Sequence, residues 1–100
     1  MGHKPRYRPK RLAAKLLQIR LSLGLSQSQL ARLLHVGVNA PRLCEYEKGT
    51  REPALVTLLA YGYLIGISTD NLIDDRVDLP AEIRIKPRRK TVDIRRTENI

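Results

Sequence analysis

The chain has 100 residues, 42% of them hydrophobic, and its formal net charge of +9 favours a polyanionic partner, either nucleic acid or an anionic membrane surface. Its length suits one small domain with tails. Its longest apolar stretch is too short and too interrupted to cross a bilayer, and no secretion signal follows the basic start. A single cysteine excludes an internal disulfide, which is typical of a cytoplasmic protein. Because no stretch can span a bilayer and no secretion signal is seen, we expect no membrane association.

The first nine residues are basic and are interrupted by Pro5 and Pro9, which block helix formation. The first 20 residues hold seven Lys and Arg and no acidic residue. We therefore expect residues 1–9 to form a flexible basic arm ahead of the folded domain.

Two helices are predicted after this arm. Apolar residues recur at three- and four-residue spacing on one face of the first helix: Leu12, Leu16, Ile19 and Leu23. Gly24 supplies a left-handed stop. Ser26 and Gln29 have the spacing of a capping box, which begins a second helix that should end near His35.

A third helix is predicted after the glycine-containing turn at residues 35–38. Asn39 is a favourable N-cap, Pro41 fits the first helical turn, and Gly49 ends the helix. The residues expected to face inward are Leu43, Tyr46 and Cys44, the last as a packed thiol.

Two further helices complete the predicted domain, which spans residues 10–75. Pro53 should open the fourth helix and Gly66 should end it, with a buried stripe made of Leu55, Leu58, Leu59, Gly62 and Ile65. Ser68 should cap a short fifth helix that buries Leu72 and Ile73. Five helices without a strand pattern among them predict an all-α domain.

Residues 76–100 form a second basic segment, with eight Lys and Arg against four acidic residues. Ile83 and Ile85 alternate with charged residues, as do Val92 and Ile94. This alternation predicts either a β-arm or hairpin, or a disordered basic tail.

Four segments of the helical domain resemble the XRE-type (phage Cro/repressor-like) helix-turn-helix family. They are residues 25–34 (LSQSQLARLL), 45–49 (EYEKG), 51–55 (REPAL) and 66–73 (GISTDNLI). The resemblance covers about residues 10–75, and it implies a five-helix lambda-repressor-like DNA-binding domain. The turn at residues 34–39 is longer than family members usually have, which is a departure that affects the angle of the third helix.

The resemblance implies that residues 39–48 form a recognition helix that enters the major groove of double-stranded DNA. The positions expected to meet bases are Asn39, Ala40, Pro41, Arg42 and Glu45. Arg42 is the expected partner of a guanine, whereas Glu45 either accepts from a cytosine or remains solvated. Since Ala40 and Pro41 offer only apolar contacts, specificity is expected to rest partly on the arms or on DNA shape.

Further roles follow from the same resemblance. The residues expected to contact phosphates are Gln27, Ser28, Gln29, Lys48, Thr50 and Arg51. The arm is expected to enter a minor groove through Lys4, Arg6 and Arg8, with a solubilising tail as the alternative. Arg20 and Glu47 are expected to form a largely buried ion pair.

No arrangement suited to catalysis, a metal or a cofactor is evident, so we predict a protein that is not an enzyme.

The predicted function is a sequence-specific transcriptional regulator, with repression by a homodimer as its expected form. The alternative is an antitoxin-like or adaptor protein, in which residues 79–100 bind a protein partner by adding to its sheet. RNA binding through the two basic ends is a third possibility.

Overall fold

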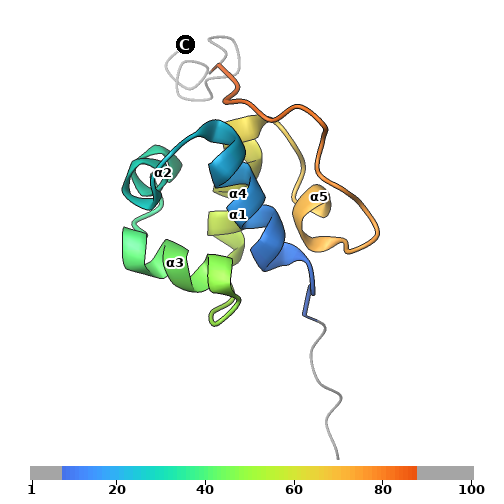
Figure 1. Cartoon of the computed structure of the whole chain (residues 1–100), viewed down its shortest axis with the longest axis horizontal. Helices are drawn as coiled ribbons and strands as arrows, with labels where there is room; N and C mark the ends of the chain where they lie inside the picture. The colour runs from blue at the N-terminus through green and yellow to red at the C-terminus, as the bar shows by residue number, and fades with distance from the viewer. Residues whose placement is uncertain (1–7, 88–100) are drawn as a thin grey trace, which may run out of the picture.

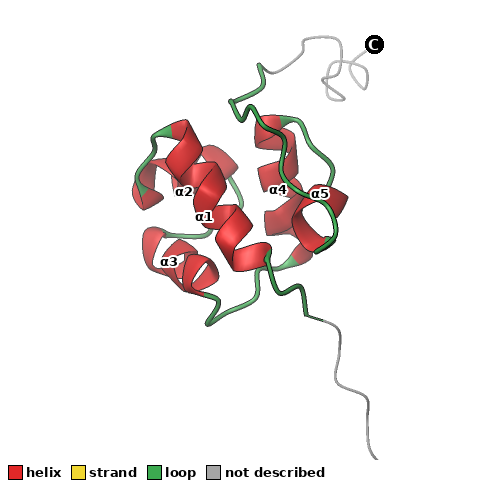
Figure 2. Cartoon of the chain, turned by 45° about the vertical axis from the view of Figure 1, so that its right-hand side comes forward, coloured by secondary structure: helices red, strands yellow, loops and turns green. Residues whose placement is uncertain are grey.

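The computed structural model describes residues 8–87 of the chain. It contains α1 (Leu12–Leu23), α2 (Gln27–Leu34), α3 (Ala40–Lys48), α4 (Leu55–Ile65) and α5 (Asp70–Ile73), as Figure 1 shows. No strand occurs within residues 8–87, as the colouring of Figure 2 makes clear. The prediction of an all-α domain with five helices is confirmed.

The helices enclose one aliphatic core to which every helix contributes. Helix α1 packs against α3 and α5, while α2 packs against α3 and α4. The fully buried side chains include Leu16, Ile19, Leu30, Leu43, Tyr61 and Leu72. Helix α3 lies at one edge of this arrangement, on the side away from α5 (Figures 1 and 2).

The predicted caps define the ends of α1, α2 and α3. Gly24 has a left-handed backbone (φ 70) and ends α1. At the start of α2, Ser26 Oγ accepts from the Gln29 backbone N–H at 3.1 Å, and Gln29 Oε1 accepts from the Ser26 N–H at 2.8 Å. Asn39 Oδ1 accepts from the Arg42 N–H at 3.0 Å and begins α3. These local predictions are confirmed.

The turn between α2 and α3 is held against the core. Helix α2 ends at Leu34, and His35 adopts a left-handed conformation (φ 56) as its C-cap. Val36 and Val38 are half-buried and pack against the core cluster. This packing fixes the turn at residues 34–39, and it therefore sets the direction of α3 relative to α2.

Helix α4 differs from the prediction in its start and in some of its buried residues. It begins at Leu55 rather than at Pro53, with Ala54 as an extended N-cap. Leu58, Gly62 and Ile65 are buried as predicted, whereas Leu55 and Leu59, which were expected to be buried, are exposed, and Thr57 and Tyr61 are buried in their place. A Cβ at Gly62 would lie 2.6 Å from the backbone oxygen of Ile67, so this close approach helps to set which side of α4 faces the core.

Helix α5 also differs slightly from the expectation. Its N-cap is Thr69 rather than Ser68, although the Ser68 hydroxyl accepts from the Asp70 N–H at 3.2 Å. Leu72 is buried as predicted, whereas Ile73 is half-buried.

The segment after α5 packs onto the domain instead of forming a separate β-arm. Leu79 and Ile83 pack against the core cluster, and the Lys86 N–H donates to the Leu64 carbonyl at 2.8 Å. The segment therefore runs from α5 to the C-terminal end of α4 (Figure 1). Residues 76–87 contain no strand, and the second half of the predicted hairpin, with Val92 and Ile94, lies outside the described residues.

Candidate nucleic-acid interface

Helix α3 is amphipathic, and its polar side faces solvent. Leu43 and Tyr46 are buried, whereas Arg42 and Lys48 are exposed and Glu45 is half-exposed. Since positions 42, 45 and 48 are three residues apart, they lie along one side of the helix. This side presents two basic groups and one carboxylate to the solvent.

Glu45 lies between two guanidinium groups. Its Oε1 atom is 2.7 Å from Arg51 Nε and 3.4 Å from Arg42 Nε. All three side chains are about half-exposed, so each pair contributes little to stability, typically less than about 1 kcal/mol. These contacts are therefore weak enough to exchange with another ligand of either arginine.

The start of α3 combines a capping residue with two apolar positions. The Asn39 side-chain oxygen is used by the cap, so only its amide N–H groups remain to donate elsewhere. Ala40 is half-buried, whereas Pro41 is exposed and stands in the first turn. Arg42 is accordingly the side chain with the greatest hydrogen-bonding capacity in this part of the helix.

The beginning of α2 approaches α3 through a side-chain contact. Gln27 Nε2 donates to Glu47 Oε1 at 3.1 Å, and Gln29 is engaged in the capping box. Ser28 is exposed. The start of a helix offers backbone N–H groups to an anion, so α2 presents a suitable place for a phosphate beside α3.

Arg20 and Glu47 join α1 to the inner side of α3. Arg20 Nε donates to Glu47 Oε2 at 2.9 Å, Arg20 Nη2 donates to Oε1 at 3.0 Å, and Nη1 donates to the Leu25 carbonyl at 3.1 Å. The Glu47 side chain is only 4% exposed. The hydrogen bonds from Arg20 to Glu47 raise the pKa of Arg20, and the pair fixes α3 on the scaffold.

The loop after α3 continues the solvent-facing surface. Lys48 and Thr50 are exposed, and the Thr50 hydroxyl and N–H both donate to the Glu45 carbonyl. Arg8, Lys10 and Arg51 line one groove between the start of α1 and this loop. The base of the basic arm therefore lies beside the C-terminal end of α3. Lys4 and Arg6 lie outside the described residues.

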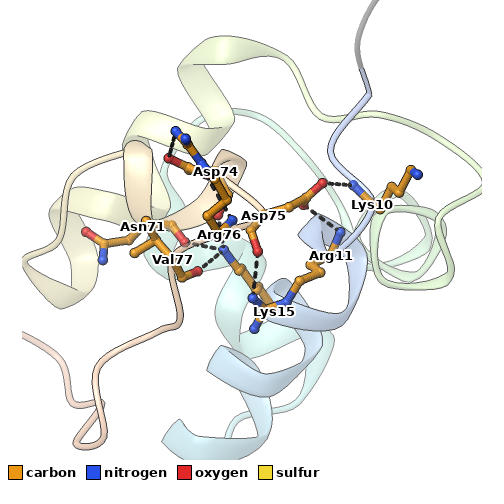
Figure 3. A network of polar contacts seen from close by, with 8 residues as sticks. All are labelled: Lys10, Arg11, Lys15, Asn71, Asp74, Asp75, Arg76 and Val77. Atoms are coloured by element: carbon orange, nitrogen blue, oxygen red, sulfur yellow. Dashed lines mark hydrogen bonds and ion pairs between the residues drawn. The ribbon is translucent and has the colours of Figure 1, made fainter.

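A buried lysine, which the sequence interpretation did not identify, ties α1 to α5 and to the segment after it (Figure 3). Lys15 is 2% exposed, and its Nζ donates to the carbonyls of Asn71, Asp74 and Val77 at 2.7, 3.0 and 2.6 Å. Burial, followed by the charge of Arg11, lowers the pKa of Lys15, and nearby carboxylates oppose that shift. The signal was its spacing, three residues after Leu12 and four before Ile19, at a position where an apolar residue is expected.

Asp75 caps the start of α1 from the same segment. Its two carboxylate oxygens accept from the backbone N–H groups of Lys10 and Arg11, both at 3.0 Å. The Arg11 side chain donates to the Asp75 carbonyl at 2.8 Å and forms an ion pair with Asp78 at 2.6 Å. The point at which the arm leaves the domain is thus fixed by contacts 64 to 67 residues away in sequence.

Residues 8–87 contain no group of three or more His, Cys, Asp and Glu side chains that could hold a metal ion. None of the helices in this range is long and apolar enough to cross a membrane.

A helix-turn-helix family model, HTH_3, matches residues 16–72, which is more than half of the chain and extends from α1 into α5. The search of curated proteins and the search of solved structures gave no match.

Proposed function

Since this chain belongs to the XRE-type helix-turn-helix family and is a DNA-binding regulator with the lambda-repressor-like fold, we propose that it is a repressor that places α3 in the major groove of an operator. The observation that carries this proposal is the exposure of Pro41, Arg42 and Lys48 on α3, which leaves that side accessible within the described residues. As part of this proposal, the protein is a homodimer, is not an enzyme and acts in the cytoplasm.

Arg42 is the proposed base-contacting residue of highest specificity. A guanine offers its O6 and N7 atoms to one guanidinium group, which matches the geometry of arginine. In the free protein, Arg42 is 3.4 Å from Glu45, while Glu45 is closer to Arg51 at 2.7 Å. When Arg42 turns to a base, Glu45 keeps its partner Arg51, so the carboxylate is not left unpaired near the phosphates.

The flanking residues of α3 are proposed to contribute in different ways. Ala40 and Pro41 offer apolar contacts to a thymine methyl group, and the Asn39 amide is left to donate. Glu45 either accepts from a cytosine or sets the register by repelling phosphates.

Phosphate contacts are proposed on both sides of α3. The beginning of α2, at Gln27, Ser28 and Gln29, offers backbone N–H groups on one side. On the other side lie Lys48, Thr50 and Arg51, and beside them Arg8 at the base of the arm. The arm residues Lys4, Arg6 and Arg8 are proposed to continue into a minor groove.

The first test is a selection of bound duplexes from a random pool. A dimer with two copies of α3 should enrich sequences with two-fold symmetry, whose half-sites are about one helical turn (~34 Å) apart. A pool without an enriched sequence would contradict specific recognition.

The second test compares Arg42→Ala with Arg84→Ala, which removes the same charge from an exposed position in the segment after α5. We expect Arg42→Ala to weaken binding to the selected duplex by about 1–3 kcal/mol and to have little effect on a scrambled duplex. Arg84→Ala should leave the preference for the selected duplex intact. If Arg42→Ala lost the same affinity for both duplexes, Arg42 would contact a phosphate and not a base.

The antitoxin-like or adaptor alternative receives less support from the structure. Leu79 and Ile83 belong to residues 79–100, but they pack against the chain's own core. A deletion from residue 79 would therefore disturb folding, and a deletion of residues 88–100 is the cleaner test. Loss of a protein partner with unchanged DNA binding would favour the adaptor.

A further inference from the structure

One carboxylate joins the parts of the chain that lie before and after the family match. The match covers residues 16–72, so the base of the arm precedes it and the segment after α5 follows it. The Asp75 side chain accepts from the backbone N–H groups of Lys10 and Arg11, one on each oxygen and both at 3.0 Å. Two charge-assisted bonds to adjacent N–H groups constrain the orientation of that backbone. Asp75 therefore sets the direction from which the chain enters α1.

This contact stands where α1 has no local cap. Arg11 is the N-cap residue of α1, its side chain makes no cap hydrogen bond, and the first turn of the helix contains no acidic residue. A helix start without a local cap leaves its N–H groups to other acceptors. Here the acceptor is 64 to 65 residues away in the chain. The conformation of residues 10 and 11 thus depends on a distant residue.

Asp75 is itself held in place by the buried lysine of α1. Lys15 Nζ donates to the carbonyls of Asp74 and Val77, which stand on either side of Asp75 in the chain, and also to the carbonyl of Asn71. Figure 3 shows these contacts together. Three bonds to one buried ammonium fix the backbone of this segment, so the Asp75 carboxylate has a defined position.

The same contacts give the two basic residues before α1 different roles. The Arg11 guanidinium donates to the Asp75 carbonyl at 2.8 Å and forms an ion pair with Asp78 at 2.6 Å. The Lys10 side chain instead points away from Asp75 (Figure 3). Together with Arg8, it lines the groove between the start of α1 and the loop after α3, which we call the basic groove. Arg11 is therefore engaged within the domain, whereas Lys10 and Arg8 border the basic groove.

The basic groove has the charge and the place of a phosphate contact. Three of its lining side chains are basic and one is a carboxylate: Arg8, Lys10, Arg51 and Glu52. Gly49, which ends α3, also lines it. The groove thus lies beside the helix that is proposed to enter the major groove, where basic side chains reach the phosphates of the duplex backbone.

We propose that Asp75 is a positioning residue for DNA binding, which holds the base of the arm so that Lys10 and Arg8 bind a backbone phosphate in the basic groove. This inference rests on the proposed function, and it gives a role in DNA binding to a residue outside the matched domain. The expected sign is opposite to that of simple electrostatics. Loss of a carboxylate near a polyanion raises affinity when charge alone matters. Loss of Asp75 lowers affinity, because the two cations lose their direction.

The first experiment compares Asp75→Asn with Asp78→Asn, which makes the same chemical change three residues away, at the partner of the Arg11 side chain. An asparagine at position 75 retains one acceptor oxygen but presents an amide donor to the second N–H group. We expect Asp75→Asn to bind both the selected and the scrambled duplex more weakly. The slope of log K against log salt concentration should fall by about one to two, since each phosphate contact contributes about 0.9.

Asp78→Asn should bind at least as tightly as the native chain, with the same slope. The preference of Asp75→Asn for the selected duplex over the scrambled one should equal that of the native chain, because this preference depends on α3. An unchanged or increased affinity of Asp75→Asn would overturn the proposal. A loss of the preference together with the affinity would also overturn it, because Asp75 would then act through the fold as a whole.

A second experiment tests Lys10 without disturbing the anchor. Lys10→Ala alters an exposed side chain and should leave thermal unfolding unchanged, while the salt slope on both duplexes should fall by about 1. In the Asp75→Asn background the same substitution should have much less effect, since Lys10 no longer reaches the basic groove. An unchanged slope for Lys10→Ala, or an equal effect of this substitution in both backgrounds, would contradict the proposal.

These results are separable from the test of the proposed function, because the salt slope can be measured on a duplex of any sequence. A chain that enriches no sequence but shows the expected slopes would remove operator recognition and leave the role of Asp75 standing. A chain that binds its selected duplex with a slope unaffected by Lys10→Ala and Asp75→Asn would remove this inference alone.

Discussion

The two glutamates near the end of α3 have opposite surroundings. The Glu47 side chain is 4% exposed, and its Oε2 atom lies 2.9 Å from Arg20 Nε. Glu45 is 44% exposed, and its Oε1 atom lies 2.7 Å from Arg51 Nε. The bond lengths are similar, so burial rather than distance determines what each pair does. The inner pair fixes α3 to the scaffold, and the outer contacts remain exchangeable for the proposed DNA contacts.

The largest expected effect is that of Glu47→Gln. This variant leaves Arg20 without a counter-charge in a mostly buried position, and we expect the free energy of unfolding to fall by about 3–5 kcal/mol. Urea unfolding followed by circular dichroism measures this change. A loss below about 1 kcal/mol would mean that the inner pair is no more important than a surface contact.

Lys15→Met should have the next largest effect. Methionine fills similar space but leaves the carbonyls of Asn71, Asp74 and Val77 without their donor, so we expect a loss of about 2–3 kcal/mol. Lys10→Met is the control, because Lys10 is exposed and should change stability by less than about 0.5 kcal/mol. Equal stabilities of the two variants would contradict a structural role for the buried ammonium.

Glu45→Gln makes the same chemical change as Glu47→Gln, two residues away on the same helix. We expect the free energy of unfolding to change by less than about 1 kcal/mol, since both partners of Glu45 are about half-exposed. Its effect should instead be on DNA, where loss of the carboxylate increases affinity for duplexes of any sequence. If the two glutamine variants were destabilised equally, the contrast between the inner and outer sides of α3 would be lost.

The smallest expected effect concerns acid and the exposed pair of Asp74 and Arg76. Hydrogen bonds from the Arg76 side chain and then its backbone N–H lower the pKa of Asp74 to about 2. Because this pKa lies below the ordinary aspartate value, the stabilisation is present above about pH 4 and is lost as the pH falls through about 2. The stability difference between the native chain and Asp74→Asn should therefore shrink over that range. A difference that stays constant between about pH 5 and pH 2 would show that the ionisation of Asp74 is not linked to folding.

The proposed DNA interface depends on both local and distant contacts. The motif at residues 25–34 and the caps at Ser26 and Asn39 were identifiable because each involves residues close together in the chain. The contact between Glu45 and Arg51 was not identifiable in this way. It depends on how Gly49 ends α3 and turns the following loop back beside the helix.

The sequence by itself determined the five helices, most of their ends and the family, because helix periodicity, caps and stop glycines act over a few residues. Only the tertiary structure decided that Leu55 and Leu59 face solvent on α4 while Thr57 and Tyr61 are buried, because a helix that is apolar nearly all around carries little periodic signal. The partners of Lys15 were likewise decided by the fold, since they lie 56 to 62 residues away in the chain. The hydrogen-bond acceptors of a buried charge such as Lys15 can be identified only in the folded structure, because packing brings these distant carbonyls together.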